Sequence, residues 1–323
     1  MEEKLSFDIP SLDIHDFTNG NPQDKERFVE DLGKGFHDIG FVAVKNHGLN
    51  KMLSEELYKA VKSFFDLADI VKEKYNIPGL AGQRGYVGKG KEHAKGRKTG
   101  DLKEFFHIGQ EVNEDDPLTN SYPPNVWPEE VPELRTFGVK AFEVLEQTGM
   151  RILSAIALYL ELPEDYFDKK AEKGNSILRP IHYFPITDPN SIPEDAVRAA
   201  AHGDINLITL LMGASAEGLQ ILGKNGQWIS VTAKPDQLIV NVGDMLARLT
   251  NDRLKSTVHR VVNPPRELMK YPRYSIPFFM HPRAEMDLTC LENCVSDEHP
   301  KQYEDITAGE FLQERLREIG LAK

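Results

Sequence analysis

The chain lacks most features that mark secreted, membrane-spanning or nucleic-acid-binding proteins. Its 323 residues include only two cysteines, Cys290 and Cys294, which we interpret as reduced thiols in a surface segment rather than a disulfide or a zinc site. No run of about 18 apolar residues occurs, so we expect no membrane span. The net charge of -12 disfavours a nucleic-acid partner, because phosphate binding requires basic stripes.

The N-terminus and the length favour a cytoplasmic protein with a substantial core. The first residues, Met1 to Lys4, are charged, and no apolar segment follows them, which argues against a secretory signal. We therefore expect a cytoplasmic location. At 36.5 kDa the chain could form one large domain or two. The sequence does not determine the oligomeric state, and we favour a monomer.

Two histidines and an aspartate form the pattern with the most chemical content. His202-Gly203-Asp204 is followed by His259 in the run from 256 to 264. Alternate side chains of a strand share a face, so one strand could supply His202 and Asp204 while a distant strand supplies His259. Two imidazoles and one carboxylate on one face of a metal leave three adjacent positions open. This arrangement is typical of non-haem Fe(II) oxygenases.

The segments around these residues are predicted to be β-strands. This context supports a metal site more strongly than the H-x-D pattern alone, which is common by chance. The segments are rich in β-branched residues and leucine and are bounded by turn residues. Asn225-Gly226 is a hairpin turn signal between two of them. The predicted strands are 202–211, 218–222, 226–231, 238–244 and 273–279.

Arg273 and Ser275 share a strand face and predict an anion site. A guanidinium presents a rigid fork of donors that matches a carboxylate, and a hydroxyl two residues along can add a third hydrogen bond. An acid held there could extend its other end towards a metal bound by His202, Asp204 and His259. Such an acid would be a co-substrate.

Helical spacing of apolar residues predicts helices on both sides of the strand-rich region. The N-terminal pair flanks a predicted strand at 40–44, and we expect both helices to cover the outside of the strand-rich core. Thr307 and Glu310 fit a capping box at the start of a C-terminal helix. The predicted helices are 28–39, 53–65, 132–160 and 307–321.

One basic, glycine-rich stretch between Leu80 and Asp101 interrupts the acidic character of the chain. It is not a P-loop, because the required spacing is absent. We consider two interpretations: a solvated loop, or a lid whose positive charge attracts an anionic substrate. The second makes five residues in and beyond the stretch candidates for substrate contact, namely Arg84, Tyr86, His93, Phe105 and His107.

Taken together, these motifs resemble the isopenicillin N synthase-like family of 2-oxoglutarate- and Fe(II)-dependent oxygenases. The matching pieces follow the family's order over nearly the whole chain. They are Ile9 to Asp13, Gly40 to Leu49, Leu178 to Pro185, His202-Gly203-Asp204, Gly218-Leu219-Gln220, Asn241 to Asp244, the His259 run and Arg273-Tyr274-Ser275.

The resemblance implies a mainly β fold with flanking helices. Its core would be a distorted double-stranded β-helix, or jelly roll, wrapped by N-terminal helices and a C-terminal helix. We expect one oxygenase unit over 1–323. Within it we expect a mainly helical region at 1–175, a jelly-roll core with the iron site at 176–285 and a C-terminal helical segment at 286–323.

The resemblance also implies the chemistry. Fe(II) would be held by His202, Asp204 and His259, and the far carboxylate of 2-oxoglutarate by Arg273 and Ser275. Dioxygen would be consumed, succinate and carbon dioxide released, and a small-molecule substrate hydroxylated or desaturated. The pocket-lining strand departs from the family pattern. Many plant members have Asn-x-Tyr-Pro where this chain has His182-Tyr183-Phe184-Pro185, so we expect polar help for the co-substrate from His182 or Tyr183.

Two other functions remain open from the sequence. The family includes oxidases that use the Arg-Ser pair without 2-oxoglutarate, either gripping the substrate's carboxylate or relying on ascorbate. A non-catalytic ligand-binding barrel would share the fold but not the turnover. Formation of succinate that depends on a substrate would separate the expected dioxygenase from both.

Overall fold

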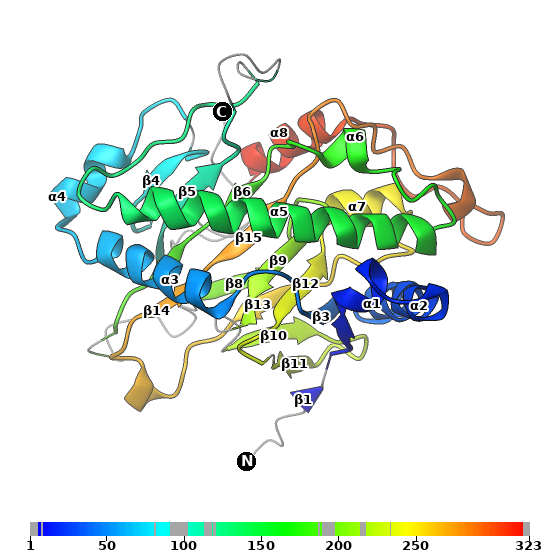
Figure 1. Cartoon of the computed structure of the whole chain (residues 1–323), viewed down its shortest axis with the longest axis horizontal. Coiled ribbons are helices and arrows are strands. Elements are labelled where there is room, and N and C mark those ends of the chain that lie inside the picture. The colour runs from blue at the N-terminus through cyan, green and yellow to red at the C-terminus, as the bar shows by residue number, and fades with distance from the viewer. Residues whose placement is uncertain are drawn as a thin grey trace.

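Two β-sheets form the centre of the molecule, and helices cover the outside of the larger sheet (Figure 1). The computed structural model describes residues 6–7, 9–80, 82–90, 103–112, 118, 121–186, 188, 198–213, 218–232 and 234–318. The two sheets carry strands from distant parts of the chain and form the expected jelly-roll core.

The larger sheet has ten strands in the order β14-β7-β5-β6-β15-β9-β12-β3-β2, with β4 paired to β5. Most neighbours are antiparallel, and β2 pairs with β3 in parallel. Its strands are β2 (Ser11–Asp13), β3 (Phe41–Lys45), β4 (Gly85–Val87), β5 (Lys103–Gly109), β6 (Ile177–Leu178), β7 (Ile181–Tyr183), β9 (Ile208–Met212), β12 (Leu238–Val242), β14 (Arg273–Ser275) and β15 (Pro277–Met280).

The smaller sheet has five strands in the order β1-β11-β10-β13-β8. It contains the predicted hairpin, whose turn includes Gly226 at a φ of 76°, in the left-handed region that favours glycine. Its strands are β1 (Ser6–Phe7), β8 (Ala199–His202), β10 (Leu219–Leu222), β11 (Trp228–Val231) and β13 (His259–Val261).

The predicted helices are confirmed. The long helix α5 lies across the larger sheet in Figure 1, and α2 and α3 contact it. The capping box is present, since Thr307 Oγ1 and N–H donate to Glu310 and the Glu310 N–H donates back. The helices are α1 (Ile14–Thr18), α2 (Pro22–Asp38), α3 (Lys51–Phe65), α4 (Asp69–Lys72), α5 (Glu133–Tyr159), α6 (Asp168–Ala171), α7 (Asp244–Leu249) and α8 (Ala308–Glu318).

The expectation of one strand over 202–211 was wrong. β8 ends at His202 in the smaller sheet, and β9 begins at Ile208 in the larger one. The intervening turn carries the chain from one sheet to the other. Its backbone is held by α7, since the Asp244 N–H donates to the Asp204 carbonyl at 2.7 Å. Asp204 therefore lies in a turn between the sheets and not on the His202 strand.

The larger sheet also extends beyond the range expected for the barrel. Strands β2, β3 and β5 lie before residue 176, and each pairs within the same sheet as β9 and β15. The region 1–175, which we expected to be mainly helical, thus also contributes strands to the larger sheet.

The two cysteines are free, as expected, but they do not lie on the surface. Both Cys290 and Cys294 are buried, each with 7% of its surface exposed. They pack as small apolar residues near the buried side chain of Asn251. Among the described residues, no helix is both long enough and apolar enough to cross a membrane.

Glu146 on α5 makes the stability of the fold depend on pH. Burial raises the pKa of its carboxyl to about 7, against about 4.5 in the unfolded chain. Between these values the unfolded state ionises and the folded state keeps its proton. This group therefore lowers the free energy of unfolding as pH rises through that window, by roughly 3 kcal/mol at most.

Replacement of Glu146 by Gln should remove this dependence, because an amide does not ionise. Relative to the unmodified chain, Glu146→Gln should gain stability progressively from pH 4.5 to pH 7. Urea unfolding across that range would measure the gain. Glu143→Gln, at an exposed position on the same helix, should follow the unmodified chain. If the free energy of unfolding changes with pH in the same way in all three proteins, the assignment to Glu146 is contradicted.

Candidate active site

Three side chains that are distant in sequence converge where the two sheets face each other. His202, Asp204 and His259 each offer a ligand atom, and these atoms lie within 4.8 Å of one another. The Oδ1 atom of Asp204 is 3.8 Å from His202 Nε2 and 3.7 Å from His259 Nε2. The strands β8 and β13 pair directly, with His202 opposite His259, so sheet register brings the two imidazoles together.

Each imidazole is oriented by its second nitrogen. His202 Nδ1 lies 2.7 Å from the Ala200 carbonyl, and His259 Nδ1 lies 3.1 Å from the Thr257 carbonyl. A carbonyl only accepts, so these contacts place the proton on Nδ1 and leave the Nε2 lone pairs for a metal. The ring of Phe41 packs edge-on against His259, with the ring centres 5.7 Å apart.

The carboxylate of Asp204 is fixed in the same way. Its Oδ2 accepts hydrogen bonds from Thr209 Oγ1 at 2.7 Å and Asn241 Nδ2 at 2.8 Å. Thr209 and Asn241 are opposite each other on β9 and β12. These contacts leave Oδ1 directed at the histidines, so the three ligand atoms form one preorganised set.

The charges at this site suit a divalent cation. Burial by itself would raise the pKa of Asp204, but His259, His202 and the hydrogen bonds from Asn241 and Thr209 leave that pKa below its usual value. Desolvation within the site and the neighbouring His259 lower the pKa of His202 to about 4, although 44% of its side chain is exposed. At neutral pH the site therefore offers a carboxylate and a neutral imidazole, the forms that bind metals.

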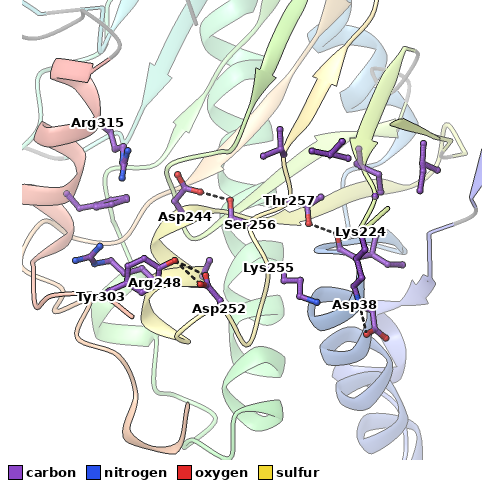
Figure 2. Close-up of a pocket in the computed structure, with 18 residues that line it drawn as sticks. Asp38, Lys224, Asp244, Arg248, Asp252, Lys255, Ser256, Thr257, Tyr303 and Arg315 are labelled. Carbon is purple, nitrogen blue, oxygen red and sulfur yellow. Dashed lines mark hydrogen bonds and ion pairs between the residues drawn. The ribbon is translucent and has the colours of Figure 1, made fainter. Parts of the chain in front are cut away.

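Gly203 allows the turn between the ligands to pack closely. A Cβ there would lie 3.0 Å from Asp244 Oδ1 and 3.1 Å from Ser256 Oγ, which are themselves hydrogen-bonded at 2.5 Å. Figure 2 shows this bond at the edge of a pocket of about 760 Å³. The pocket lies between the end of α2, the β10–β11 hairpin, α7 and α8. It contains none of the three ligand residues, so it backs onto the site without being part of it.

The pairing of strands defines one face of the larger sheet as the side of the ligands, and we call it the inner face. Phe279 is opposite Thr209, which contacts Asp204, and is also opposite Ile177. Ile177 is in turn opposite Gly109 on β5. Because alternate residues share a face, the inner face of β5 continues through His107, Phe105 and Lys103.

Arg273 and Ser275 lie on this inner face, as the sequence predicted. In the pairing of β14 with β7, Arg273 is opposite Tyr183 and Ser275 is opposite Ile181. The Arg273 guanidinium lies 4.8 Å from the centre of the Tyr183 ring. Arg273 and Ser275 are buried, with 9% and 5% of their surfaces exposed. We call Arg273 and Ser275 the co-substrate clamp, after the role that the family resemblance implies for them.

The structure separates the two residues that were expected to help the clamp. Tyr183 lies beside Arg273 and carries a hydroxyl. His182 is on the opposite, outer face, where its Nδ1 contacts Glu104 Oε1 at 2.7 Å and its ring stacks on Tyr274. The expectation that His182 contacts the co-substrate is therefore not supported.

Two described residues of the basic stretch, Arg84 and Tyr86, do not supply the expected contacts. Tyr86 is 4% exposed, and its hydroxyl donates to Glu104, a residue of the outer face. Arg84 is 1% exposed and packs against Gly109, with Nη1 donating to the Gln83 carbonyl at 2.7 Å. Both are core residues. His93 lies outside the described residues.

Phe105 and His107 do lie on the inner face, and they share a residue that the sequence reasoning missed. Arg179 lies between the rings of Phe105 and Phe279, at 4.6 Å and 5.0 Å from their centres. Its Nε donates to His107 Nε2 at 2.5 Å. The signal in the sequence was a charge within the apolar run Ile177-Leu178-Arg179-Pro180-Ile181.

His281 is another polar residue of this region that the sequence did not single out as a site residue. It follows Phe279 by two positions on the inner side. Burial lowers the pKa of its imidazole to about 4, and the neighbouring charges of Asp204 and Arg179 also act on it. In the part of the chain that the structure describes, its buried Nδ1 has no hydrogen-bond partner.

Comparison with known proteins decides the family. Residues 9–130 match a family described as non-haem dioxygenase in morphine synthesis, N-terminal, and residues 175–282 match the 2OG-Fe(II) oxygenase superfamily. The chain belongs to the 2OG-Fe(II) oxygenase superfamily. It is a 2-oxoglutarate-dependent dioxygenase that uses Fe(II), 2-oxoglutarate and dioxygen, as the resemblance implied.

Three relatives illustrate the similarity over the full length of the chain. Proline hydroxylase buaE of Petromyces alliaceus is 33% identical and is aligned over 96% of this chain and 99% of its own length. A structure from Caulobacter crescentus, described as a 2OG-Fe(II) oxygenase family protein, is 42% identical with a TM-score of 0.85, over 96% of this chain and 99% of that one. A full-length Neurospora crassa protein solved in complex with alpha-KG is 31% identical with a TM-score of 0.85, over 98% and 99%.

Loss of the Thr209 hydroxyl should weaken metal binding, because Asp204 would lose one of the two donors that orient it. Thr209→Val preserves shape, and we expect the dissociation constant for Fe(II) to rise about tenfold. Anaerobic titration with Fe(II) would measure it. Thr148→Val removes a buried hydroxyl that contacts the His47 carbonyl and serves as the control. Equal affinities in the two variants would contradict the role of Thr209.

Proposed function

We propose that His202, Asp204 and His259 bind Fe(II), and that the enzyme hydroxylates or desaturates a small molecule while 2-oxoglutarate is converted to succinate and carbon dioxide. The observation that carries the proposal is the convergence of two Nε2 atoms and one Oδ1 atom, while the other nitrogen or oxygen of each side chain is already occupied. Two histidines and one carboxylate leave the positions that such chemistry requires.

Iron with 2-oxoglutarate and dioxygen would supply an oxidant able to remove hydrogen from a C–H bond. The protein contributes position and environment. The hydrogen bonds to Asp204 Oδ2 keep its other oxygen on the metal side. The backbone contacts of His202 and His259 hold their rings in the tautomer that binds metal.

We propose that the co-substrate clamp binds the carboxylate of 2-oxoglutarate that is remote from the metal. The guanidinium of Arg273 can donate two parallel hydrogen bonds to a carboxylate, and Ser275, on the same face, can donate a third. Burial of both residues excludes water and strengthens these contacts. Tyr183 lies beside Arg273 and bounds the same space.

The clamp can be tested directly. Arg273→Ala should raise the dissociation constant for 2-oxoglutarate roughly 10- to 100-fold, because a charge-assisted pair is lost. Fe(II) binding should not change. Anaerobic titration of the Fe(II) protein, followed by the visible band of the 2-oxoglutarate chelate, would measure both. Arg266→Ala, at an exposed position in the turn before β14, is the matched control. Unchanged affinity in Arg273→Ala would refute the clamp.

We propose that the substrate lies against the inner face beside Arg179 and His281. Arg179 is held by Phe105, Phe279 and His107, and Phe279 is opposite the residue that supports Asp204. A cation fixed this close to the metal ligands would bind a carbonyl or carboxylate oxygen of the substrate. His281 Nδ1 offers a further hydrogen bond. The rings of Phe105 and Phe279 would form walls around a compact substrate.

The proposed substrate class is therefore a small molecule that carries an oxygen acceptor, and an anionic substrate fits this class. Two relatives give precedents of this kind. One is named a proline hydroxylase, and the Neurospora crassa protein has also been solved with alpha-KG and thymine. A carboxylate or a ring carbonyl would serve as the acceptor in such compounds.

Succinate formation with paired compounds would test this substrate class. Each pair contains a small molecule with a carboxylate or ring carbonyl and its analogue without that group, beginning with proline and pyrrolidine. Only the acceptor-bearing members should stimulate turnover. Arg179→Ala should lose most of this stimulation while retaining 2-oxoglutarate binding. Equal stimulation by both members of every pair would refute the role of Arg179.

A further inference from the structure

Behind the co-substrate clamp, on the outer face of the sheet, lies a buried cluster of charged and polar side chains. The carboxylate of Glu104 accepts hydrogen bonds from Lys72 Nζ at 2.8 Å and 3.1 Å and from the Tyr86 hydroxyl at 2.5 Å. His182 Nδ1 contacts it at 2.7 Å. Glu104, Lys72, Tyr86 and His182 are only 1%, 3%, 4% and 8% exposed.

The cluster is closely hydrogen-bonded, and Lys72 also pairs with the exposed Asp69 at 3.0 Å. Burial raises the pKa of Glu104, but the hydrogen bonds from His182, Lys72 and Tyr86 outweigh it and leave that pKa below its usual value. The carboxylate therefore remains ionised among its donors. Such buried ion clusters add little net stability compared with apolar packing, because desolvation offsets the attraction. Its value to this protein must then lie in what it positions.

Strand pairing connects the cluster to the clamp. Glu104 on β5 is opposite His182 on β7, and His182 is opposite Tyr274 on β14. The rings of His182 and Tyr274 are stacked, with their centres 4.9 Å apart and their planes 12° from parallel. Tyr274 lies between Arg273 and Ser275 in the chain. Glu104, His182 and Tyr274 form a row on the outer face. Along the strands, this row lies between the two inner-face pairs that contain the clamp, Tyr183–Arg273 and Ile181–Ser275.

The strand that carries the clamp needs such support. β14 has only three residues and lies at the end of the sheet order. A short edge strand has few hydrogen bonds to specify its register, and a slip of one residue would move Arg273 and Ser275 to the outer face. The stacked pair of His182 and Tyr274 opposes this slip, because it holds the middle residue of β14 on the outer face.

We propose that Glu104, fixed by Lys72 and Tyr86, positions the co-substrate clamp through His182 and Tyr274. These are positioning residues, since none of them lies on the inner face. The inference rests on the proposed role of Arg273 and Ser275. It explains why an ion cluster is buried between α4, β4, β5 and β7. In Figure 1, α4, β4, β5 and β14 lie at the same end of the molecule.

The test is a comparison of 2-oxoglutarate and Fe(II) binding in Glu104→Gln and Tyr274→Ala. Each variant should raise the dissociation constant for 2-oxoglutarate roughly 5- to 10-fold, because one pairing or hydrogen bond that orders β14 is lost. Fe(II) affinity should not change, and kcat at saturating 2-oxoglutarate should remain within about twofold. Titration of the anaerobic Fe(II) protein by the chelate band would measure the first two quantities.

Two variants serve as controls. Tyr274→Phe retains the stacked ring and should bind 2-oxoglutarate as the unmodified enzyme does. Glu130→Gln alters another carboxylate that accepts from a tyrosine and a lysine, Tyr75 and Lys74, but away from the clamp. It should leave 2-oxoglutarate affinity unchanged even if the melting temperature falls.

The outcomes separate this inference from the proposed function. If Arg273→Ala weakens 2-oxoglutarate binding but folded Tyr274→Ala and Glu104→Gln do not, the positioning role is overturned and the clamp stands. A parallel loss of Fe(II) affinity in both variants would also overturn it, because the effect would then be general. If Arg273→Ala has no effect, the clamp and its positioning are both refuted.

Discussion

The active site depends on one constraint: three ligand atoms must face a common point although their side chains could turn elsewhere. Asp204 meets it through hydrogen bonds from Thr209 and Asn241 to Oδ2. His202 and His259 meet it through backbone carbonyls at Nδ1. The partners come from β9, β12 and the residues just before each histidine. Metal binding at these three residues, as proposed, therefore depends on the register of both sheets, because the sheets hold the groups that orient the ligand atoms.

The same sheet pairing separates chemistry from support. One face of β5, β7 and β14 carries Phe105, Tyr183, Arg273 and Ser275, and strand pairing makes this the inner face, which Thr209 shares. The other face carries the Glu104 cluster and is packed against α3, where Phe64 contacts Phe106. Alternation along a strand thus places the surface with the proposed clamp and the surface with the Glu104 cluster one residue apart. A change of register would exchange them, so the pairing of a three-residue strand has functional weight.

Much of this arrangement could be predicted from local patterns. Helical spacing located α2, α3 and α5, and a capping box marked α8. The two-residue alternation of Arg273 and Ser275 correctly placed both on one face. Errors arose where the outcome depends on contacts distant in the chain. His182 and Tyr183 are adjacent, and only the pairing of β7 with β14 shows which of them faces Arg273. Arg84 and Tyr86 have polar side chains in a glycine-rich stretch, yet β4 pairs with β5 and buries them.

The amino-acid sequence alone determined the proposed ligand set, the anion-binding pair and the order of helices and strands, because periodicity and residue chemistry are local properties. Only the tertiary structure decided that His202 and Asp204 belong to different structural segments, that Arg179 and His281 lie near the ligands, and that Glu104 is buried behind the clamp. Each of these depends on which strands become neighbours. That choice is made by packing of the whole chain, since a sheet pairs residues without regard to their separation in sequence.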